Sequence, residues 1–173
     1  MAMKLLSESG CSRRVINHCR AVEKVATKIA EACKKRGLDV DVKLVQVGAL
    51  LHDIGRSKTH GVDHAIVGAE IARSLNLPEA VISIIERHVG GGITTEEAKN
   101  LGWLVKSYVP ETLEEKIVSY ADKLIEGSKR VSIEQTIRKF SKKLPLSSIA
   151  GMRKLHEEIT SLIGDFDANR HVA

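Results

Sequence analysis

The adjacent residues His52 and Asp53 are the first candidates for chemistry in this sequence. They end a strongly apolar stretch that favours a buried helix, just before Gly55 allows the backbone to turn. A carboxylate buried at such a place costs several kcal/mol unless a cation compensates its charge. Neutral imidazole and carboxylate are natural ligands for Zn, Fe or Mn, so the pair indicates a metal site. An isolated His-Asp pair is nevertheless more often a helix cap beside a core histidine, and the prediction therefore depends on other residues.

Four further residues stand where metal ligands would be expected. His18 lies on the apolar face of the first predicted helix, an expensive position for a lone imidazole. His64 opens a helix directly after the loop that follows the His-Asp pair. His88 ends another helix before Gly90–Gly92, a triple-glycine turn that would let a substrate approach closely. Asp122 is the one acid in the apolar middle of its helix, so all four favour a buried polar site.

The order of these residues, His, then His-Asp, then His, His and Asp, resembles that of the HD-domain superfamily of metal-dependent phosphohydrolases. The pair stands in that family's frequent form, Leu51-His52-Asp53-Ile54-Gly55, and the resemblance covers roughly residues 12–128. It is strongest in four stretches, Ala49–Gly55, His64–Glu70, Ile85–His88 and Glu115–Leu124. The last three are similar to the HD-type diadenosine tetraphosphate hydrolases, whose sites hold two metals, and to small archaeal and bacterial HDIG proteins.

This resemblance implies a site for two metal ions. The residues that match the first site are His18, His52, Asp53 and Asp122, and those that match the second are His64, His88 and again Asp53, as a bridge. His52 and Asp53 would form the catalytic pair. We expect two divalent transition ions, Fe, Mn, Ni or Co, with Zn or Mg as alternatives. Such ions acidify a shared water and neutralise phosphoryl oxygens, so no protein nucleophile is required.

Basic residues near the motif are candidates for binding the substrate. Arg56, Lys58 and His60 lie in the loop after the pair, Lys123 follows the last acid, and Arg87 would flank the mouth of the site. A solvated basic loop explains the first three equally well. The formal net charge of +5 favours phosphorylated substrates by electrostatic steering. The expected function is therefore hydrolysis of a phosphoester or phosphoanhydride bond in a small nucleotide-like substrate.

Two other functions stay open. One is a non-catalytic HD module that binds a nucleotide or a protein partner, which the loss of a ligand would favour, and none of the six is missing. The other is an RNA-end processing factor that uses a basic C-terminal surface, formed by Lys129, Arg130, Arg138, Lys139, Lys142 and Lys143. Aromatic residues make up only 3% of the chain and provide few stacking platforms, so binding of nucleic acid is not favoured.

The elements that position these residues are predicted to be helices almost throughout. Apolar residues recur at intervals of three and four, and capping residues such as Ser12, Asp39, Asp63 and Thr94 precede several of the segments. We expect a polar loop over Gly55–Gly61 and a frayed tail over Asp165–Ala173. The predicted helices cover approximately residues 13–36, 40–54, 63–75, 78–88, 95–101, 113–126, 133–143 and 146–163.

These helices predict an all-α fold, a single compact HD-domain bundle of about eight helices over residues 1–173. The HD core would cover about 12–128 and two C-terminal helices about 131–164. Cys11, Cys19 and Cys33 form no CxxC motif, and we expect structural roles for them. No apolar run reaches the roughly 18–20 residues of a membrane span, and no secretory signal is evident, so a cytoplasmic location without membrane contact is expected.

Overall fold

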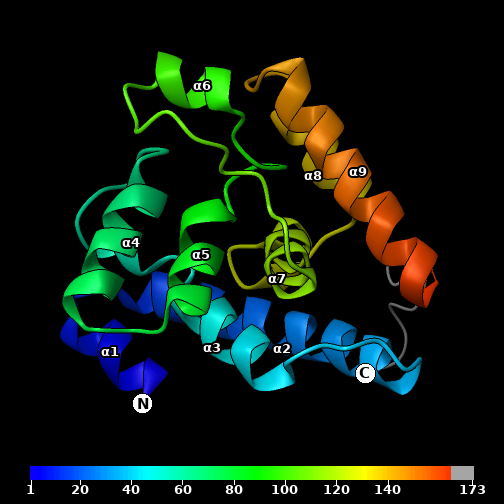
Figure 1. Cartoon of the computed structure of the whole chain (residues 1–173), viewed down its shortest axis with the longest axis horizontal. Coiled ribbons are helices and arrows are strands. Elements are labelled where there is room, and N and C mark those ends of the chain that lie inside the picture. The colour runs from blue at the N-terminus through cyan, green and yellow to red at the C-terminus, as the bar shows by residue number, and fades with distance from the viewer. Residues whose placement is uncertain (165–173) are drawn as a thin grey trace.

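The computed structural model describes residues 1–164, and over this part of the chain the fold is all-α, as predicted (Figure 1). It contains nine α-helices rather than about eight within the described residues, with one short 3-10 helix and one two-stranded hairpin. The elements in chain order are α1 Ala2–Glu8, α2 Arg13–Lys35, α3 Val42–Leu51, the 3-10 helix η1 Ile54–Ser57, α4 His64–Ser74, α5 Glu79–Arg87, α6 Thr95–Asn100, α7 Leu113–Lys123, β1 Ile125–Glu126, β2 Lys129–Arg130, α8 Ile133–Phe140 and α9 Leu146–Ile163. The predicted tail Asp165–Ala173 lies outside the described residues.

Side-chain caps mark the starts of several helices, although the predicted cap Asp63 makes no capping hydrogen bond at the start of α4. The Ser12 hydroxyl accepts a hydrogen bond from the backbone N–H of Val15 at the start of α2, and Thr94 forms a reciprocal capping box with Glu97 at α6. The prediction that Asp39 caps α3 is wrong, because the carboxylate of Asp41 accepts from the N–H of Leu44 instead. Val40 packs in the core just before this cap, so the chain enters the helix two residues later than expected.

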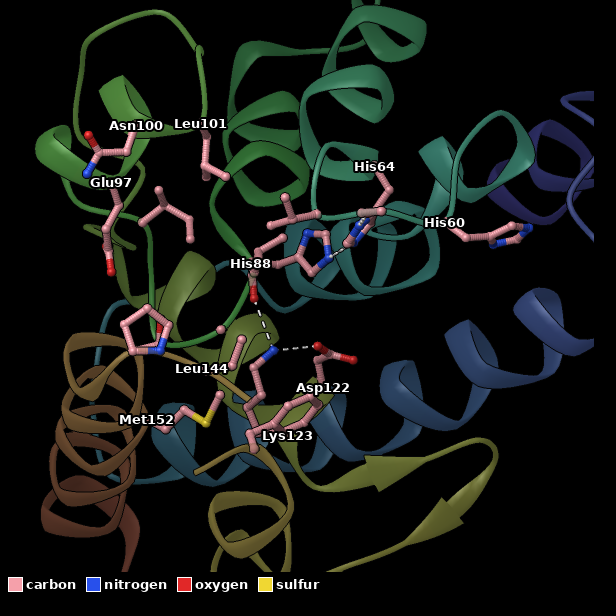
Figure 2. A pocket seen from close by; sticks show the side chains of 18 of the residues that line it. His60, His64, His88, Glu97, Asn100, Leu101, Asp122, Lys123, Leu144 and Met152 are labelled. Carbon is pink, nitrogen blue, oxygen red and sulfur yellow. Dashed lines mark hydrogen bonds and ion pairs between the residues drawn. The ribbon is translucent and has the colours of Figure 1, made fainter. Parts of the chain in front are cut away.

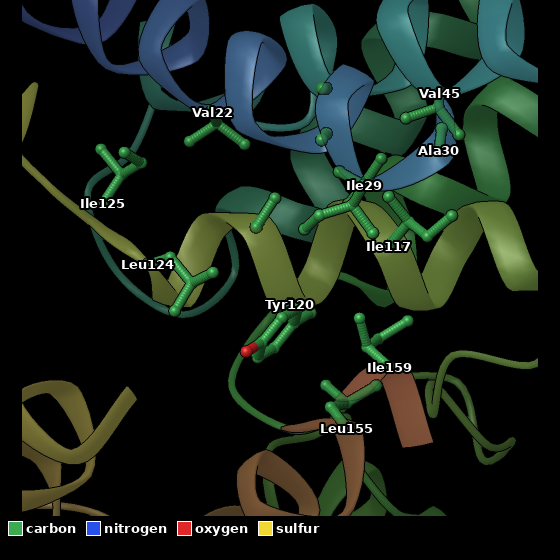
Figure 3. Packing of buried hydrophobic residues seen from close by; sticks show 14 of the residues in the cluster. Val22, Ile29, Ala30, Val45, Ile117, Tyr120, Leu124, Ile125, Leu155 and Ile159 are labelled. Carbon is green, nitrogen blue, oxygen red and sulfur yellow. The ribbon is translucent and has the colours of Figure 1, made fainter. Parts of the chain in front are cut away.

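Helix α7 lies at the centre of the main apolar cluster. Ile29 of α2 packs on one side of it, and Leu155 and Ile159 of α9 pack on the other, beside the ring of Tyr120 (Figure 3). Tyr120 also shares a hydrogen bond of 2.8 Å with Nδ1 of His156, which is half-buried. The α2–α7–α9 packing therefore fixes the helix that carries Asp122.

A second apolar cluster joins α1 to α5. It includes Leu6, Cys19, Leu51, Ile54 and Ile85, so the two helix ends that carry His52 and His88 share one core. Helix α1 escaped prediction because it is only seven residues long and buries a single side chain, that of Leu6. All three cysteines are buried and unpaired, which confirms their structural role.

Two segments near the candidate site differ from the prediction. Helix α7 ends at Lys123 rather than Glu126, because Ile125 and Glu126 pair in antiparallel register with Arg130 and Lys129 across a turn at Gly127, whose φ is +61°. The expected loop after the His-Asp pair begins as η1.

None of the described helices combines the length and the apolar composition needed to cross a bilayer.

Candidate metal centre

The structure brings all six predicted ligands to one place, from helix segments that are distant in sequence. Four of them, His52, Asp53, His64 and His88, are buried, and the other two are half-buried. The six are His18 in the second turn of α2, His52 and Asp53 at the end of α3, His64 at the start of α4, His88 at the end of α5 and Asp122 in the last turn of α7.

The carboxylate of Asp53 lies at the centre of this group. Its Oδ1 is 3.1 Å from Nε2 of His64 and 3.4 Å from Nε2 of His88. Its Oδ2 is 3.8 Å from Nε2 of both His18 and His52. Each oxygen therefore faces a different pair of imidazoles, which is the arrangement that a bridging carboxylate needs.

Asp122 completes the group on the side of His18. Its Oδ1 is 2.9 Å from Nε2 of His18 and 3.5 Å from Nε2 of His52. Its Oδ2 accepts a hydrogen bond of 2.6 Å from Nζ of Lys123, which also donates to the carbonyl of His88 at 3.2 Å. Lys123 thus joins a residue of the first predicted site to one of the second (Figure 2).

The backbone holds all four imidazoles with Nδ1 away from the centre and Nε2 towards it. In each ring Nδ1 lies 2.7 Å from a carbonyl oxygen, which can only accept a hydrogen bond, so Nδ1 carries a proton and Nε2 points to the centre, with a free lone pair there whenever the ring is neutral. The carbonyls are those of Gly127 for His18, Ala49 for His52, Gly61 for His64 and Ile85 for His88.

Hydrogen-bond acceptors consequently face one another inside the site. Nε2 of His64 and Nε2 of His88 are 3.0 Å apart, and Nε2 of His52 is buried without a hydrogen-bond partner. Such a group is unfavourable unless a proton or a metal ion lies between its members. Two sets of three residues bring their ligand atoms within 4.8 Å of one another, His18 with His52 and Asp122, and His52 with Asp53 and His88. The residues present therefore fit divalent metal.

The electrostatics of the site also require positive charge. Burial alone would raise the pKa of Asp53, but the neighbouring His52, His64 and His88 hold it well below its ordinary value. Burial lowers the pKa of His88 to about 4, so this ring is neutral at pH 7. Burial would also lower the pKa of His52, but it is raised well above its ordinary value, chiefly by Asp53. An ionised carboxylate in this buried site therefore favours the binding of a cation.

Gly55 allows η1 and α4 to meet. A Cβ atom at this position would lie 1.9 Å from the carbonyl oxygen of His64 and 2.6 Å from the backbone nitrogen of Gly68. Only glycine permits this contact, which brings the first turn of α4, and with it His64, against Asp53. The sequence motif therefore has a packing cause as well as a chemical one.

Arg56 and His60, among the predicted substrate-binding residues, lie beside the centre. Nε of Arg56 donates a hydrogen bond of 2.7 Å to Oδ2 of Asp53, and its NH1 donates to the carbonyl of His60 at 3.3 Å. Lys58 is exposed and lines none of the pockets that contain the six residues. Arg87 is not brought to the mouth of the site as expected, because Glu111 and Glu115 hold its guanidinium at 2.9 and 3.1 Å.

A pocket of about 510 Å³ opens from the centre towards α6, α8 and α9 (Figure 2). His64, His88 and Asp122 lie at one end of it. Two clefts, of about 210 and 350 Å³, reach the centre past His18 and Asp53. Several residues of the larger pocket were not predicted from the sequence, because no motif connects them to the His-Asp pair. They are Asn100, Phe140, Leu144 and Met152.

The triple-glycine turn serves packing more than substrate approach. Gly90 does line the large pocket. A Cβ atom on Gly91, however, would lie 2.3 Å from the backbone of Gly151 and Met152, so this glycine admits helix α9. The prediction that the turn admits a substrate therefore applies at most to Gly90.

Comparisons with known proteins bear on the family and the fold of the chain. The family model described as HD domain matches residues 15–127. The uncharacterized protein MJ0778 of Methanocaldococcus jannaschii is 52% identical, over 88% of this chain and 92% of its own length. A tRNA (cytidine(56)-2'-O)-methyltransferase of Picrophilus torridus is 43% identical over 94% of this chain, which spans only 46% of that protein. The crystal structure of the phosphodiesterase PgpH HD domain from L. monocytogenes, in complex with cyclic-di-AMP, has the same fold, with a TM-score of 0.54 at 18% identity and coverage of 99% and 98% of the two chains.

Proposed function

This chain belongs to the HD domain family, and we propose from that premise that it is a metal-dependent phosphohydrolase acting on a nucleotide-like substrate. The bond cleaved would be a phosphoester or a phosphoanhydride. One observation carries the proposal: four imidazoles and two carboxylates direct their acceptor atoms into one buried space, with the two oxygens of Asp53 facing different pairs of imidazoles. This arrangement favours two ions that share Asp53.

The residues divide between two ions as follows. His18, His52 and Asp122 would hold one, His64 and His88 would hold the other, and Asp53 would bind both. Four imidazoles favour Fe, Mn, Co or Ni over Mg. When bound, such a pair of ions acidifies a water molecule near neutral pH and neutralises charge on a phosphoryl group.

The chain's own groups supply orientation. The four carbonyls that accept from Nδ1 keep the imidazoles from rotating, so the acceptor atoms stay in place without a substrate. Lys123 holds Asp122 and the end of α5 together. Arg56 and His60 line the large pocket on the side of the centre and would bind phosphoryl oxygens.

A second candidate function is action on the end of an RNA strand. The relative from Picrophilus torridus is named as a tRNA methyltransferase, and this chain matches less than half of it. Lys139 lines the cleft of about 210 Å³ together with His18 and Asp53, so one of the basic residues of α8 adjoins the centre. An RNA affinity that falls steeply with salt would favour this function, whereas weak, salt-insensitive binding would exclude it.

The proposal is tested by the release of inorganic phosphate or of a nucleoside phosphate, resolved by chromatography, from a panel of nucleotides and dinucleoside polyphosphates, with Mn, Fe, Co, Ni or Mg added in turn. We expect activity with at least one transition ion and a loss of about 10³-fold in Asp53→Asn, since several kcal/mol of transition-state stabilisation depend on the ions. Asp63→Asn is the matched control, because Asp63 is exposed at the start of α4 and should keep wild-type activity. Wild-type protein that binds nucleotide but releases nothing with any ion would instead support a non-catalytic module.

A further inference from the structure

The pocket of about 510 Å³ has two ends of opposite character. Lys123 and Arg56 lie at the end that adjoins the metal centre. The rest of the wall is largely apolar and includes Val89, Ile93, Leu101, Phe140, Leu144 and Met152. A volume in the range of about 300–1,000 Å³ is typical of small-molecule sites and far exceeds what a phosphoryl group alone would fill. The ligand should therefore carry an apolar body next to its anionic end.

The far wall is built in advance of any ligand. The Ser147 hydroxyl donates a hydrogen bond of 2.5 Å to Oε1 of Glu97, which ties the start of α9 to α6 across the outside of the pocket. Oε2 of the same carboxylate accepts from the backbone N–H of Thr94 at 2.8 Å. In addition to this hydrogen bond, the backbones of Gly91 and Gly151 are in contact. The wall is thus held in place at two points.

Few polar groups of the wall could recognise a ligand. Both oxygens of Glu97 are already engaged, which leaves its charge at the end of the pocket away from Lys123. Asn100 is exposed and lines the rim on the same side as Leu101, with Leu144 and Met152 on the opposite side (Figure 2). Its amide offers one acceptor and two donors, the complement of the polar edge of a heterocyclic base.

We propose that this pocket is a nucleobase subsite, in which Phe140 and Leu101 contact the faces of the base and Asn100 binds its edge while the phosphoryl group lies at the metal centre. The inference rests on the proposed function and deepens it. Arg56 and Lys123 pair with Asp53 and Asp122, so the net positive charge at this end would come from the metal ions of the proposed function. That charge, with the negative charge of Glu97 at the other end, would orient the ligand with its phosphate inwards. Phe140 is half-buried and lies in the apolar part of the wall, so it offers a flat surface on which a base stacks.

The same chemistry has two possible sources, a free nucleotide or the terminal nucleotide of an RNA strand. Calorimetry on the full chain separates them without any need for turnover. The probes are the 3′- and 5′-phosphates of the four ribonucleosides, ribose 5-phosphate as the compound without a base, and a short RNA with a 3′-terminal phosphate. We expect at least one nucleotide to bind about ten-fold or more tightly than ribose 5-phosphate. Tighter binding of the RNA than of every mononucleotide assigns the base to a strand end, and the reverse assigns it to a free nucleotide.

Paired variants test the location of the base. Phe140→Leu should weaken nucleotide binding by roughly 5- to 150-fold and leave ribose 5-phosphate unchanged, whereas Phe140→Tyr keeps a flat ring and should restore the preference. Leu101→Trp fills the pocket from a position that is 43% exposed and should abolish the preference. Leu104→Trp is its matched control, because Leu104 is 74% exposed and does not line the pocket.

The outcomes separate this inference from the proposed function. Equal binding of ribose 5-phosphate and all nucleotides, or a preference that survives both Phe140→Leu and Leu101→Trp, would overturn the nucleobase subsite even if phosphate release is observed. A base preference lost in these variants, in a protein that releases no phosphate with any ion, would keep the subsite and reject the hydrolase. Asn100→Ala adds a finer readout, since it should change the ranking of the four bases.

Discussion

The metal centre and the pocket beside it are built from different parts of the chain and by different forces. All six candidate ligands lie within residues 15–127, the segment that matches the HD domain family, and backbone carbonyls fix their rings. One part of the pocket wall, which includes Phe140, Leu144 and Met152, follows that segment and packs against the main apolar cluster. We infer that the reaction depends on the first region and the choice of substrate on the second.

Gly55→Ala should have the largest effect, because it damages the metal centre and the core together. The added Cβ atom would overlap the backbone of His64, so we expect a loss of about 3 kcal/mol in the free energy of unfolding, together with the bound metal. Urea unfolding and elemental analysis measure the two effects. Gly10→Ala is the control: its φ is +85° but nothing lies within 4 Å, so it should cost only about 1–2 kcal/mol and keep the metal.

His64→Asn should break one half of the centre. Losing this ligand should lower phosphate release by at least about 100-fold and reduce the metal content towards one ion per chain. His60→Asn, four residues earlier on an exposed loop, should keep the full metal content. Equal metal loss in both variants would mean that the loop, rather than the ligand set, holds the second ion.

Removal of metal should destabilise the metal centre, and the size of this effect should not depend on the pocket. At a metal concentration about 100 times its dissociation constant, binding adds about 3 kcal/mol of stability. A chelator should therefore lower the Tm of the loaded protein by about 6–12 °C. The Phe140→Leu variant should show the same lowering of Tm. A smaller lowering in that variant would mean that the pocket and the metal centre are coupled.

Gly151→Ala should have the smallest effect and act on the pocket alone. A Cβ atom there would lie 2.6 Å from the carbonyl oxygen of Gly91, so α9 must shift at a cost of about 1–3 kcal/mol. We expect a higher KM with unchanged metal content. Ala150→Ser, on the exposed face of the same helix, should leave both unchanged. Metal loss from Gly151→Ala would contradict the separation of the two regions.

The sequence predicted most of the helices because they depend on local signals, and it predicted the six residues of the candidate centre because their order resembles that of a known family. Apolar spacing and capping residues such as Ser12 and Thr94 determine where helices begin, and the ligands stand in a recognisable order. The early end of α7 escaped prediction because its cause is the pairing of Ile125 with Arg130, a contact that helical periodicity does not report.

The pocket could not be predicted for a related reason. Phe140 and Asn100 line the same pocket, whose wall is completed by the docking of α9 on Gly91, a tertiary contact with no spacing rule. Arg87 illustrates the opposite error, since a basic residue beside a ligand looked like a substrate contact and is instead neutralised by Glu111 and Glu115. Residue type indicates what a side chain can do, and only packing decides what it reaches.

Counting metal ions tests the central claim most directly. Purified protein loaded with Mn or Fe and freed of excess ion should contain about two ions per chain by elemental analysis, and Asp53→Asn should retain less than one, because both sites share this carboxylate. Wild-type protein that holds no transition metal under these conditions, or an Asp53→Asn variant that keeps both ions, would contradict a centre bridged by Asp53.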